Sequence, residues 1–343
     1  MEQVAGESPR IAVLLPCYNE AITIPKVVGD FRAALPSATV YVYDNNSSDR
    51  TAEVAALAGA VVRRETGQGK GHVVRRMFAD VDADIYVLVD GDDTYEADAA
   101  PPMIGLLVRD RLDMVTGVRV TDQQGAYRRG HRLGNRALTG LVGAIFGYGN
   151  SDMLSGYRVF NRRFVKTFPA IATGFEIETE LTVHALEMRL PIAEFRTSYR
   201  ERPAGSESKL ATYRDGIRVL RMIVQLTKAQ RPLQFFGFCS VILLLLGIGL
   251  GVPVVLEFLQ THLVPRLPTA LLATGLILLS FLSIASGLIL QAVAHGRMEV
   301  KRLAYLSIPA GNYAFTPAPP DLDPLAPGLM RKRCGALVGD GAA

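Results

Sequence analysis

The chain has 343 residues, of which 49% are hydrophobic, and this is enough for one domain of ordinary size and an additional part. Its formal charge of +4 indicates no partner until the positions of the basic residues are considered. The three cysteines, Cys17, Cys239 and Cys334, are far apart and lack metal-ligand spacing, which argues against a disulfide framework or a zinc site and fits a reducing compartment.

The first part of the chain alternates between predicted strands and helices. Residues 1–10 are polar, show no signal peptide and are expected to be flexible. The expected strands are Ile11–Leu15, Thr39–Tyr43, Ala60–Arg63 and Ile85–Val89, and the expected helices are Pro25–Ala34, Ala52–Ala58 and Val73–Ala79. This order predicts an α/β fold, with a parallel sheet and helices on both of its faces.

Polar side chains follow the predicted strands. They are Asn19, Glu20, Asp44, Asp49, Gln68, Lys70, Asp90 and Asp92. Because the carboxyl ends of parallel strands share one edge of the sheet, where open α/β folds bind ligands, we expect a nucleotide site there. The first strand is not followed by GxGxxG, and the chain has no Walker sequence, so a dehydrogenase and a P-loop ATPase are disfavoured.

The strand at Ile85 ends in three carboxylates within the sequence VDGDDTY. Carboxylates this close repel one another, and a cation would relieve the repulsion. Asp90 and Asp92 lie on the same side of an extended segment, so both can reach one ion. Mg²⁺ and Mn²⁺ prefer such oxygen ligands. The alternative is a solvated turn, because Asp and Gly are common turn residues.

The last third of the chain contains two long apolar stretches, Leu233–Leu256 and Thr269–Leu290. Each is close to the roughly 20 residues that cross a bilayer core. The link between them, Glu257–Pro268, is too short for a domain, so we expect a transmembrane hairpin.

Basic residues flank the hairpin on its outer ends. They are Arg214, Arg218, Arg221, Lys228 and Arg231 before the first stretch, and His295, Arg297, Lys301 and Arg302 after the second, against Arg266 alone in the link. The positive-inside rule then places both ends in the cytoplasm. We expect a cytosolic domain with interfacial helices at residues 11–230, the hairpin at 231–293, and a cytosolic tail at 294–343 that is largely disordered after about residue 313.

Several motifs resemble those of a known family. PCYNE, YDNNSSDRT, GQGKG and VDGDDTY resemble the nucleotide-sugar half of family-2 glycosyltransferases, which have the Rossmann-like GT-A fold. GVRV, DMLSGYRVFNRR, GFEIETEL and RPAGSESKL resemble the polyprenyl-phosphate sugar synthases, a group that includes dolichyl-phosphate mannose synthase and bacterial undecaprenyl-phosphate glycosyltransferases. The resemblance covers roughly Ile11 to Leu210, and one branch of the group also has the hairpin.

This resemblance implies inverting transfer of a hexose from a UDP- or GDP-sugar to a polyprenyl phosphate. The reaction would take place at the cytosolic face of the inner membrane, with Mg²⁺ or Mn²⁺ on Asp90 and Asp92 and no nucleic-acid partner. A homo-oligomer through the transmembrane region is an expectation at the level of the family. Thr94 stands where the family often has Gln, which leaves Asp93 or water as the third metal ligand.

The resemblance also implies site residues. For the nucleotide sugar they are Pro16, Tyr18, Glu20, Asp44, Gln68, Gly69, Lys70, Asp90 and Gly91; for the acceptor phosphate, Arg119, Arg158, Arg202, Ser208 and Lys209; and for catalysis, Asp92, Asp152 and Arg158. Asp152 is expected to orient an arginine or the phosphate region. A lipid phosphate is already ionised, so it needs positioning by cations more than a general base.

Other interpretations of these residues stay open. Asp44 and Asn45 suit a turn, Gly69 and Gly71 suit a plain loop, and Arg158 could brace the fold through Asp152. Glu176, Glu178 and Glu180 suit a solvated face, although Glu178 matches a family acid. Arg128, Arg129 and Arg132 precede the apolar-faced segment Leu133–Phe146 and suit attraction to anionic headgroups as well as acceptor binding.

Two other functions compete with this one. A processive polysaccharide synthase of the same superfamily would carry a Gln-x-x-Arg-Trp motif and more membrane helices, whereas this chain has no tryptophan and one hairpin. A non-catalytic membrane scaffold would have lost the metal acids, whereas Asp90 and Asp92 are present.

Overall fold

The protein is described here from a computed structural model. The structure describes residues 8–120, 152–203, 221, 224, 225, 228, 231–311, 313 and 315. The chain divides into two compact units. The first, called the sheet unit, comprises Met1–Leu220 and Leu303–Ala343, and the second, called the hairpin unit, comprises Arg221–Arg302.

The sheet unit is built on one mixed sheet, which has seven strands within the described residues, in the order β3-β2-β1-β4-β6-β5-β7. The strands are β1 (Ile11–Cys17), β2 (Thr39–Asp44), β3 (Val61–Arg64), β4 (Ile85–Leu88), β5 (Met114–Val120), β6 (Arg158–Asn161) and β7 (Ile192–Ser198). The first four pair in parallel, as the sequence predicts. Strand β6 is antiparallel to both β4 and β5, and β7 is parallel to β5.

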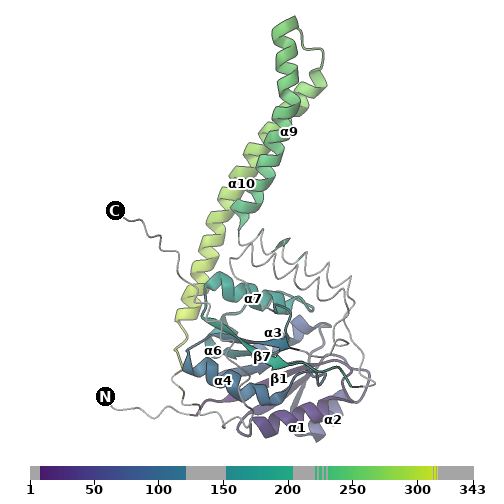
Figure 1. Ribbon diagram of the computed structural model, residues 1–343, viewed down its shortest axis with the longest axis vertical. Helices are drawn as coiled ribbons and strands as arrows, with labels where there is room; N and C mark the ends of the chain where they lie inside the picture. Colours follow the sequence, from purple (N-terminus) through teal and green to yellow (C-terminus); the bar gives the residue numbers. More distant parts are fainter. Residues whose placement is uncertain are drawn as a thin grey trace, which may run out of the picture. The chain divides into compact units, whose positions relative to one another are not determined.

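Helices cover both faces of the sheet (Figure 1). They are α1 (Ile24–Ala34), α2 (Thr51–Leu57), α3 (Lys70–Asp80), the 3₁₀ helix η1 (Ala97–Ala99), α4 (Ala100–Arg109), α6 (Arg162–Thr167) and α7 (Ile177–Met188). Helices α1, α2 and α4 lie on one face, and α3, α6 and α7 lie on the other. The three helices predicted from the sequence are thereby confirmed.

The strands form two apolar layers because successive side chains point to opposite faces of a sheet. Val13 and Val87 are fully buried in the core cluster that the strands form with α1 and α4. On the opposite face, the ring of Phe78 from α3 packs edge-on against Tyr86 of β4 and Phe160 of β6. Burial of both faces explains why these strands are continuous apolar runs rather than alternating ones.

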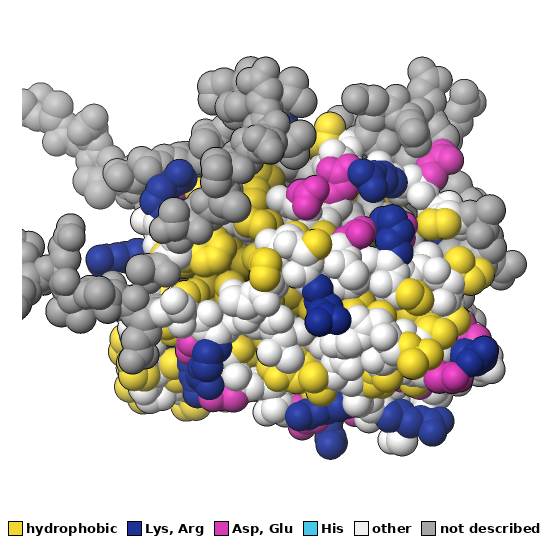
Figure 2. Space-filling model, turned by 90° about the horizontal axis from the view of Figure 1, so that it is seen from below, with side chains coloured by type: hydrophobic (Ala, Val, Ile, Leu, Met, Phe, Trp, Pro, Cys, Tyr) yellow, Lys and Arg dark blue, Asp and Glu magenta, His cyan; other side chains and the backbone are white. Residues whose placement is uncertain are grey.

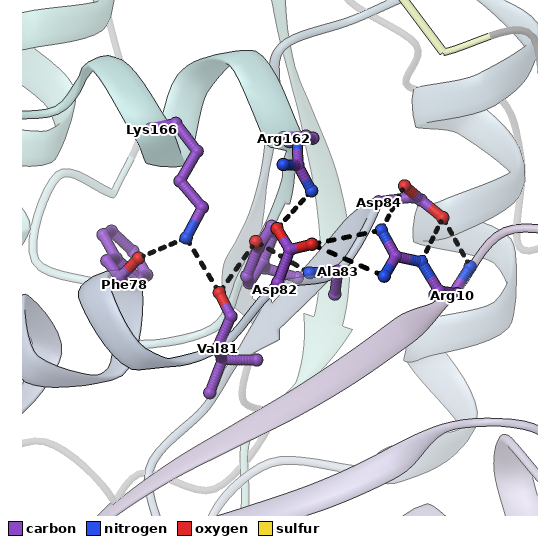
Figure 3. Close-up of polar contacts among 9 residues, drawn as sticks. Arg10, Phe78, Val81, Asp82, Ala83, Asp84, Arg162 and Lys166 are labelled. Carbon is purple, nitrogen blue, oxygen red and sulfur yellow. Dashed lines mark hydrogen bonds and ion pairs between the residues drawn. The ribbon is translucent and has the colours of Figure 1, made fainter.

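An ion cluster closes the edge of the sheet where β1 and β4 begin (Figure 3). Arg10 contacts both Asp82 and Asp84, and Arg162 contacts Asp82 from the other side. Lys166 of α6 donates to the carbonyl oxygens of Phe78 and Val81. Figure 2 shows basic and acidic side chains next to one another on one face of the molecule. Exposed pairs of this kind contribute little stability individually, so the apolar layers carry the fold.

The hairpin unit contains helix α9 (Pro232–Thr261) and helix α10 (Leu267–Leu306) up to Arg302; the end of α10 belongs to the sheet unit. Each helix is long and apolar enough to cross a membrane. Both extend past the predicted stretches 233–256 and 269–290. Buried positions recur every seven residues; they are Ser240, Gly247 and Val254 in α9, and Ala273, Ser280 and Gly287 in α10. A seven-residue repeat is the pattern of two helices packed along a coiled-coil seam.

The residues from Leu303 onward, which include the end of α10, belong to the sheet unit and pack on it. Tyr305 donates a hydrogen bond to Asp113, 3.0 Å from Oδ1, and its ring lies under the guanidinium of Arg163. The Nε of Arg163 donates to the carbonyl oxygen of Ile308 at 2.6 Å. The predicted disorder after residue 313 falls mostly outside the described residues.

Candidate active site

The carboxyl ends of the parallel strands bring four acids to one edge of the sheet. Cys17, the last residue of β1, marks this edge, and burial raises the pKa of its thiol well above the ordinary value. The charges of Glu20, Asp44, Asp90 and Asp92 all raise this pKa further, so these four carboxylates lie around the end of β1. The sequence assigns all four to the nucleotide sugar or the metal.

Lys70, the first residue of α3, forms a buried ion pair with two of the site acids. Its Nζ lies 2.5 Å from Asp90 Oδ1 and also contacts Glu178 Oε1 of α7. Burial acts to lower the pKa of Lys70, but the two carboxylates outweigh it and the pKa is raised, so the lysine stays charged. The pKa of Glu178 is also raised, because burial and the charge of Asp90 together outweigh the lowering effect of Lys70.

Asp92 is held on both of its carboxylate oxygens. Thr94 donates to Oδ1 from its hydroxyl at 2.6 Å and from its backbone nitrogen at 3.2 Å. Arg202 contacts Oδ2 through Nη2 at 2.6 Å. The Thr94 side chain therefore orients a site acid. The neighbouring Asp93 has a positive φ and pairs with Lys26 of α1 at 2.7 Å, so its carboxylate is engaged outside the acidic pair.

Arg119 and Asp152 form a two-pronged ion pair next to the acidic pair. The Nε and Nη2 of Arg119 lie 2.6 and 2.7 Å from the two oxygens of Asp152, so Asp152 does orient an arginine. The guanidinium also lies over the ring of Tyr199. Burial raises the pKa of Tyr199, the charges of Asp92 and Asp90 raise it further, and the charges of Arg119 and Arg202 lower it.

The structure contradicts the expectation that Arg158 contacts the acceptor phosphate. Its side chain is fully buried, and burial lowers its pKa to about 10. Its guanidinium nitrogens donate to the carbonyl oxygens of Ser155, Met153 and Glu178, to the hydroxyl of Thr182 and to the sulfur of Met114. A guanidinium has five N–H groups, so these five contacts leave none for a phosphate. The bracing partners are backbone carbonyls rather than Asp152.

The predicted nucleotide residues lie at the ends of β1 and β2. Asp44 is 5% exposed, and its Oδ1 has no hydrogen-bond partner within the described residues. A buried acceptor without a donor is costly, and a ligand hydroxyl or N–H would satisfy it. Tyr18 is 39% exposed beside this edge, while Pro16 and Glu20 are more buried.

The loop between β3 and α3 is fixed to the end of β2. The Asn45 side chain donates to the carbonyl oxygen of Gly67 at 2.7 Å and accepts from the backbone nitrogen of Gly69 at 2.7 Å. The Gln68 side chain is exposed and lies 3.5 Å from Asn45 Oδ1. Gly69 has φ +129°, and a Cβ there would lie 2.2 Å from the carbonyl oxygen of Thr173. This glycine is therefore required by the close approach of two segments.

Two more glycines make room for site groups. A Cβ on Gly156 would lie 2.3 Å from Asp90 Oδ2, and a Cβ on Gly91 would lie 2.7 Å from the sulfur of Cys17. Gly91 was predicted as a nucleotide-binding residue, and here it keeps the end of β1 close to the acidic loop. Gly156 was not predicted, although it lies within the motif DMLSGYRVFNRR.

Two glutamates at the start of α7 are buried, so the interpretation of Glu176, Glu178 and Glu180 as a solvated face is wrong for two of the three. Glu178 and Glu180 are 5% and 4% exposed. Glu180 accepts from the backbone nitrogens of Ile171 and Ala172, at 2.9 and 2.7 Å. The family match at Glu178 is the signal that identifies it as a site residue. Tyr95 and Tyr199, whose rings lie 5.4 Å apart, are site residues that the sequence analysis missed.

Some predicted residues lie outside the described part of the chain. They are Ser208 and Lys209, assigned to the acceptor phosphate, and Arg128, Arg129 and Arg132 with the segment that follows them.

The donor set of the acidic pair fits a divalent cation bound together with phosphate. In the described part of the chain no cluster of three or more His, Cys, Asp or Glu residues could hold a metal ion. Burial raises the pKa of Asp92 and the Asp90 charge raises it further, against the opposing effects of Arg202 and Thr94. Additional positive charge is thus favoured at the pair. Two carboxylates suit Mg²⁺ or Mn²⁺, whose other ligands are commonly phosphate and water.

The chain is similar in sequence to several known proteins. Residues 12–168 match glycosyl transferase family 2. Glycosyltransferase AglJ of Haloferax volcanii is 36% identical over 250 residues, which cover 72% of this chain and 82% of AglJ. A dolichyl-phosphate hexose transferase of the same organism is 30% identical over 222 residues, which cover 64% of this chain and 95% of that protein.

Solved structures show the same fold. Glucosyl-3-phosphoglycerate synthase from Mycobacterium tuberculosis, in complex with Mn²⁺, UDP-glucose and glycerol 3-phosphate, has a TM-score of 0.54 and 23% identity, covering 63% of this chain and 79% of that one. Mannosyl-3-phosphoglycerate synthase from Rubrobacter xylanophilus has a TM-score of 0.56 and 22% identity, covering 64% and 74%.

Proposed function

The chain belongs to glycosyl transferase family 2, and from that premise we propose that it transfers a hexose from a UDP- or GDP-sugar to a polyprenyl phosphate at a membrane surface. The observation that carries the proposal is the acidic pair Asp90 and Asp92 at the carboxyl edge of the sheet. Lys70 forms an ion pair with Asp90, and Arg202 forms one with Asp92. The name of the dolichyl-phosphate hexose transferase and the two apolar helices support a lipid acceptor.

The donor would bind across the ends of β1 and β2. Asp44 would offer its Oδ1, which has no partner among the residues that the structure describes, to a hydroxyl or N–H of the nucleoside. Pro16, Tyr18, Glu20 and Gln68 would line this part of the site. Lys70 and Gly91 would lie on the diphosphate side, where the positive charge of Lys70 favours an anion. Here we propose Asp90 and Asp92 as ligands of Mg²⁺ or Mn²⁺.

A bound divalent cation would neutralise the charge that develops on the leaving diphosphate. Asp92 is prepared for this role because Thr94 fixes one of its oxygens. Lys70 holds Asp90, and Gly156 leaves room for the Asp90 carboxylate. The protein thus fixes the positions of both acids before the donor arrives, which reduces the cost of organising the transition state.

The acceptor phosphate would bind to Arg119 and Arg202, with Ser208 and Lys209 as proposed further contacts. Asp152 fixes the orientation of Arg119 through two hydrogen bonds. Because the phosphate is already ionised, its oxygen can attack the anomeric carbon without a general base. A bond forms from this oxygen to the anomeric carbon while the bond to the diphosphate oxygen breaks. A single displacement of this kind inverts the configuration.

We place this reaction at the cytosolic face of the cytoplasmic membrane, with the hairpin unit spanning the bilayer. The basic residues on the outer flanks of the two apolar stretches support this orientation.

The experiment is a panel of radiolabelled UDP- and GDP-sugars, incubated with the full-length protein in detergent and undecaprenyl phosphate. We expect label from one donor to enter the organic phase only when the lipid phosphate is present. Label that stays aqueous with every donor would overturn the proposal. Label in a long polymer would indicate a processive synthase, and intact donors throughout would indicate a scaffold.

A further inference from the structure

The site proposed for a divalent cation already contains two cations of the protein. Lys70 lies 2.5 Å from Asp90 Oδ1, and Arg202 lies 2.6 Å from Asp92 Oδ2. A metal that binds both acids would meet the positive charge of both side chains. At least one of the two ion pairs must therefore weaken when the metal binds.

The two cations differ in how firmly they are held. The Lys70 side chain is 9% exposed and lies between two carboxylates. It therefore retains its ion pair with Glu178 when Asp90 binds a metal. The Arg202 side chain is 25% exposed. Removing a buried ammonium from its partners costs far more than moving a partly hydrated guanidinium. Arg202, rather than Lys70, is therefore the cation that can move away from its carboxylate.

The contacts of Asp92 are divided in a way that suits such an exchange. Thr94 donates twice to Oδ1, and Arg202 contacts Oδ2. If Arg202 moves away, Oδ2 becomes available while Thr94 keeps the carboxylate in place. Thr94 thus holds the Asp92 carboxylate in position, and Arg202 blocks its Oδ2 atom.

Once released from Asp92, the Arg202 guanidinium can bind a phosphate together with Arg119. Arg119 lies over the ring of Tyr199, and the charges of both Arg119 and Arg202 act on the Tyr199 phenol. Two guanidinium groups around one aromatic side chain form a cationic site suited to a phosphate.

We propose that Arg202 is exchanged between Asp92 and the acceptor phosphate: the divalent cation takes Asp92 Oδ2, and the freed guanidinium joins Arg119 in holding the phosphate. This inference rests on the proposed function and adds to it a role for Arg202, whose release from Asp92 completes the cationic site for the acceptor phosphate. Arg202 is then a coupling residue between the two substrates.

The first test measures the binding of Mn²⁺ alone to the full-length protein in detergent by electron paramagnetic resonance. Arg202→Gln removes the competing cation, so we expect it to bind Mn²⁺ about tenfold more tightly than the wild type, the equivalent of one charge-assisted contact. Arg202→Lys keeps a positive charge and should bind Mn²⁺ more weakly than Arg202→Gln. Arg200→Gln is the matched control, because Arg200 pairs with Glu96 on the surface, and it should match the wild type.

An unchanged or weaker Mn²⁺ affinity in Arg202→Gln would overturn the exchange. Asp92→Asn in the same titration separates this result from a failure of the proposed function. If Asp92→Asn binds Mn²⁺ as the wild type does, the metal site itself is wrong. If Asp92→Asn loses Mn²⁺ and Arg202→Gln equals the wild type, only the exchange is wrong.

The second test measures binding of farnesyl phosphate, a short isoprenoid phosphate, with and without Mn²⁺ and the nucleoside diphosphate. Manganese attracts phosphate in any variant, so the informative quantity is the difference between proteins. We expect Mn²⁺ and nucleotide to strengthen binding more in the wild type than in Arg202→Gln. Equal strengthening in both would overturn the second half of the exchange.

Discussion

Arg158 illustrates what a motif can and cannot predict about one residue. Its position in DMLSGYRVFNRR predicts a site residue, and its positive charge suggests a phosphate ligand. The structure instead buries the side chain and directs it at three backbone carbonyl oxygens, one of them from Glu178 of α7. Arg158 thereby fixes the start of the helix that carries a site acid. Local sequence does not reveal burial of this kind, because it depends on how β6 and α7 pack.

Replacing Arg158 should therefore destabilise the fold rather than weaken lipid binding selectively. Arg158→Ala leaves several buried carbonyl groups unpaired, and we expect a loss of about 3–5 kcal/mol in the free energy of unfolding. The apparent melting temperature of the full-length protein should fall by roughly 10 °C, and Arg158→Lys should not restore it. A variant with unchanged thermal stability and reduced lipid turnover alone would contradict this role.

The strands and helices up to β4 and the two hairpin helices were predictable, whereas the elements between β4 and the hairpin were not. Strands β1 to β4 are apolar runs separated by helices, and this pattern predicts parallel pairing. Strand β6 has four residues, two of which are Arg158 and Asn161, so it lacks a strand pattern and its antiparallel insertion between β4 and β5 cannot be inferred. The acids at the strand ends were predictable for the same reason as the parallel sheet. The partners of those acids were not, because Lys70 and Glu178 are 108 residues apart.

The seam of the hairpin unit should depend on Gly247. A Cβ at this position would lie 2.7 Å from the Ile277 side chain, whereas a Cβ at Gly249 meets no atom within 4 Å. Gly247→Ile should push α9 and α10 apart, and Gly249→Ile should not. The hydroxyls of Ser240 and Ser280 are 2.9 Å apart, so cysteines at these two positions in a background without native cysteines should form a cross-link. Equal cross-linking in both glycine variants would contradict the assigned seam.

The ion cluster in Figure 3 should make stability depend on acid pH. Burial acts to raise the pKa of Asp84, but its hydrogen bonds with Arg10 outweigh this and hold the pKa below its ordinary value of 3.8. A depressed carboxyl pKa adds stability above pH 3.8 that is lost as the pH falls through the folded-state pKa. Asp84→Asn should therefore lower the melting temperature at pH 7, and the difference from wild type should shrink below pH 3.8. A difference that is constant with pH would contradict this account.

At the scale of the whole molecule, the chain leaves the sheet unit at Leu220 and returns to it at Leu303. If α9 and α10 each cross the membrane once, as proposed, both ends of the hairpin unit lie on the same side of it. With 40 residues, α10 is about 60 Å long and exceeds the bilayer core of about 30 Å. The part of α10 that follows its apolar stretch carries His295, Arg297, Lys301 and Arg302.

A labelling experiment tests this topology. His262 follows α9 in the short link and is exposed. In intact cells, a cysteine at position 262 should react with a membrane-impermeant maleimide, because the proposed topology puts the link outside the cytoplasm. A cysteine in place of the exposed Arg200 should react only after the membrane is opened. The opposite pattern would place the sheet unit outside.

The most direct measurement compares sugar transfer by the wild type, Asp92→Asn and Asp93→Asn, with the active donor from the panel and with Mn²⁺ or a chelator. The two acids are neighbours in sequence, but Asp92 belongs to the proposed metal pair and Asp93 pairs with Lys26 on the surface. We predict that Asp92→Asn loses transfer by at least about a hundredfold, the loss expected when a charge-stabilising group is removed, while keeping a folded structure. Asp93→Asn should retain most of the activity, and the chelator should abolish transfer in the wild type. Full transfer by Asp92→Asn, or by the wild type in the chelator, would contradict the central claim that this acidic pair carries a metal-dependent glycosyl transfer.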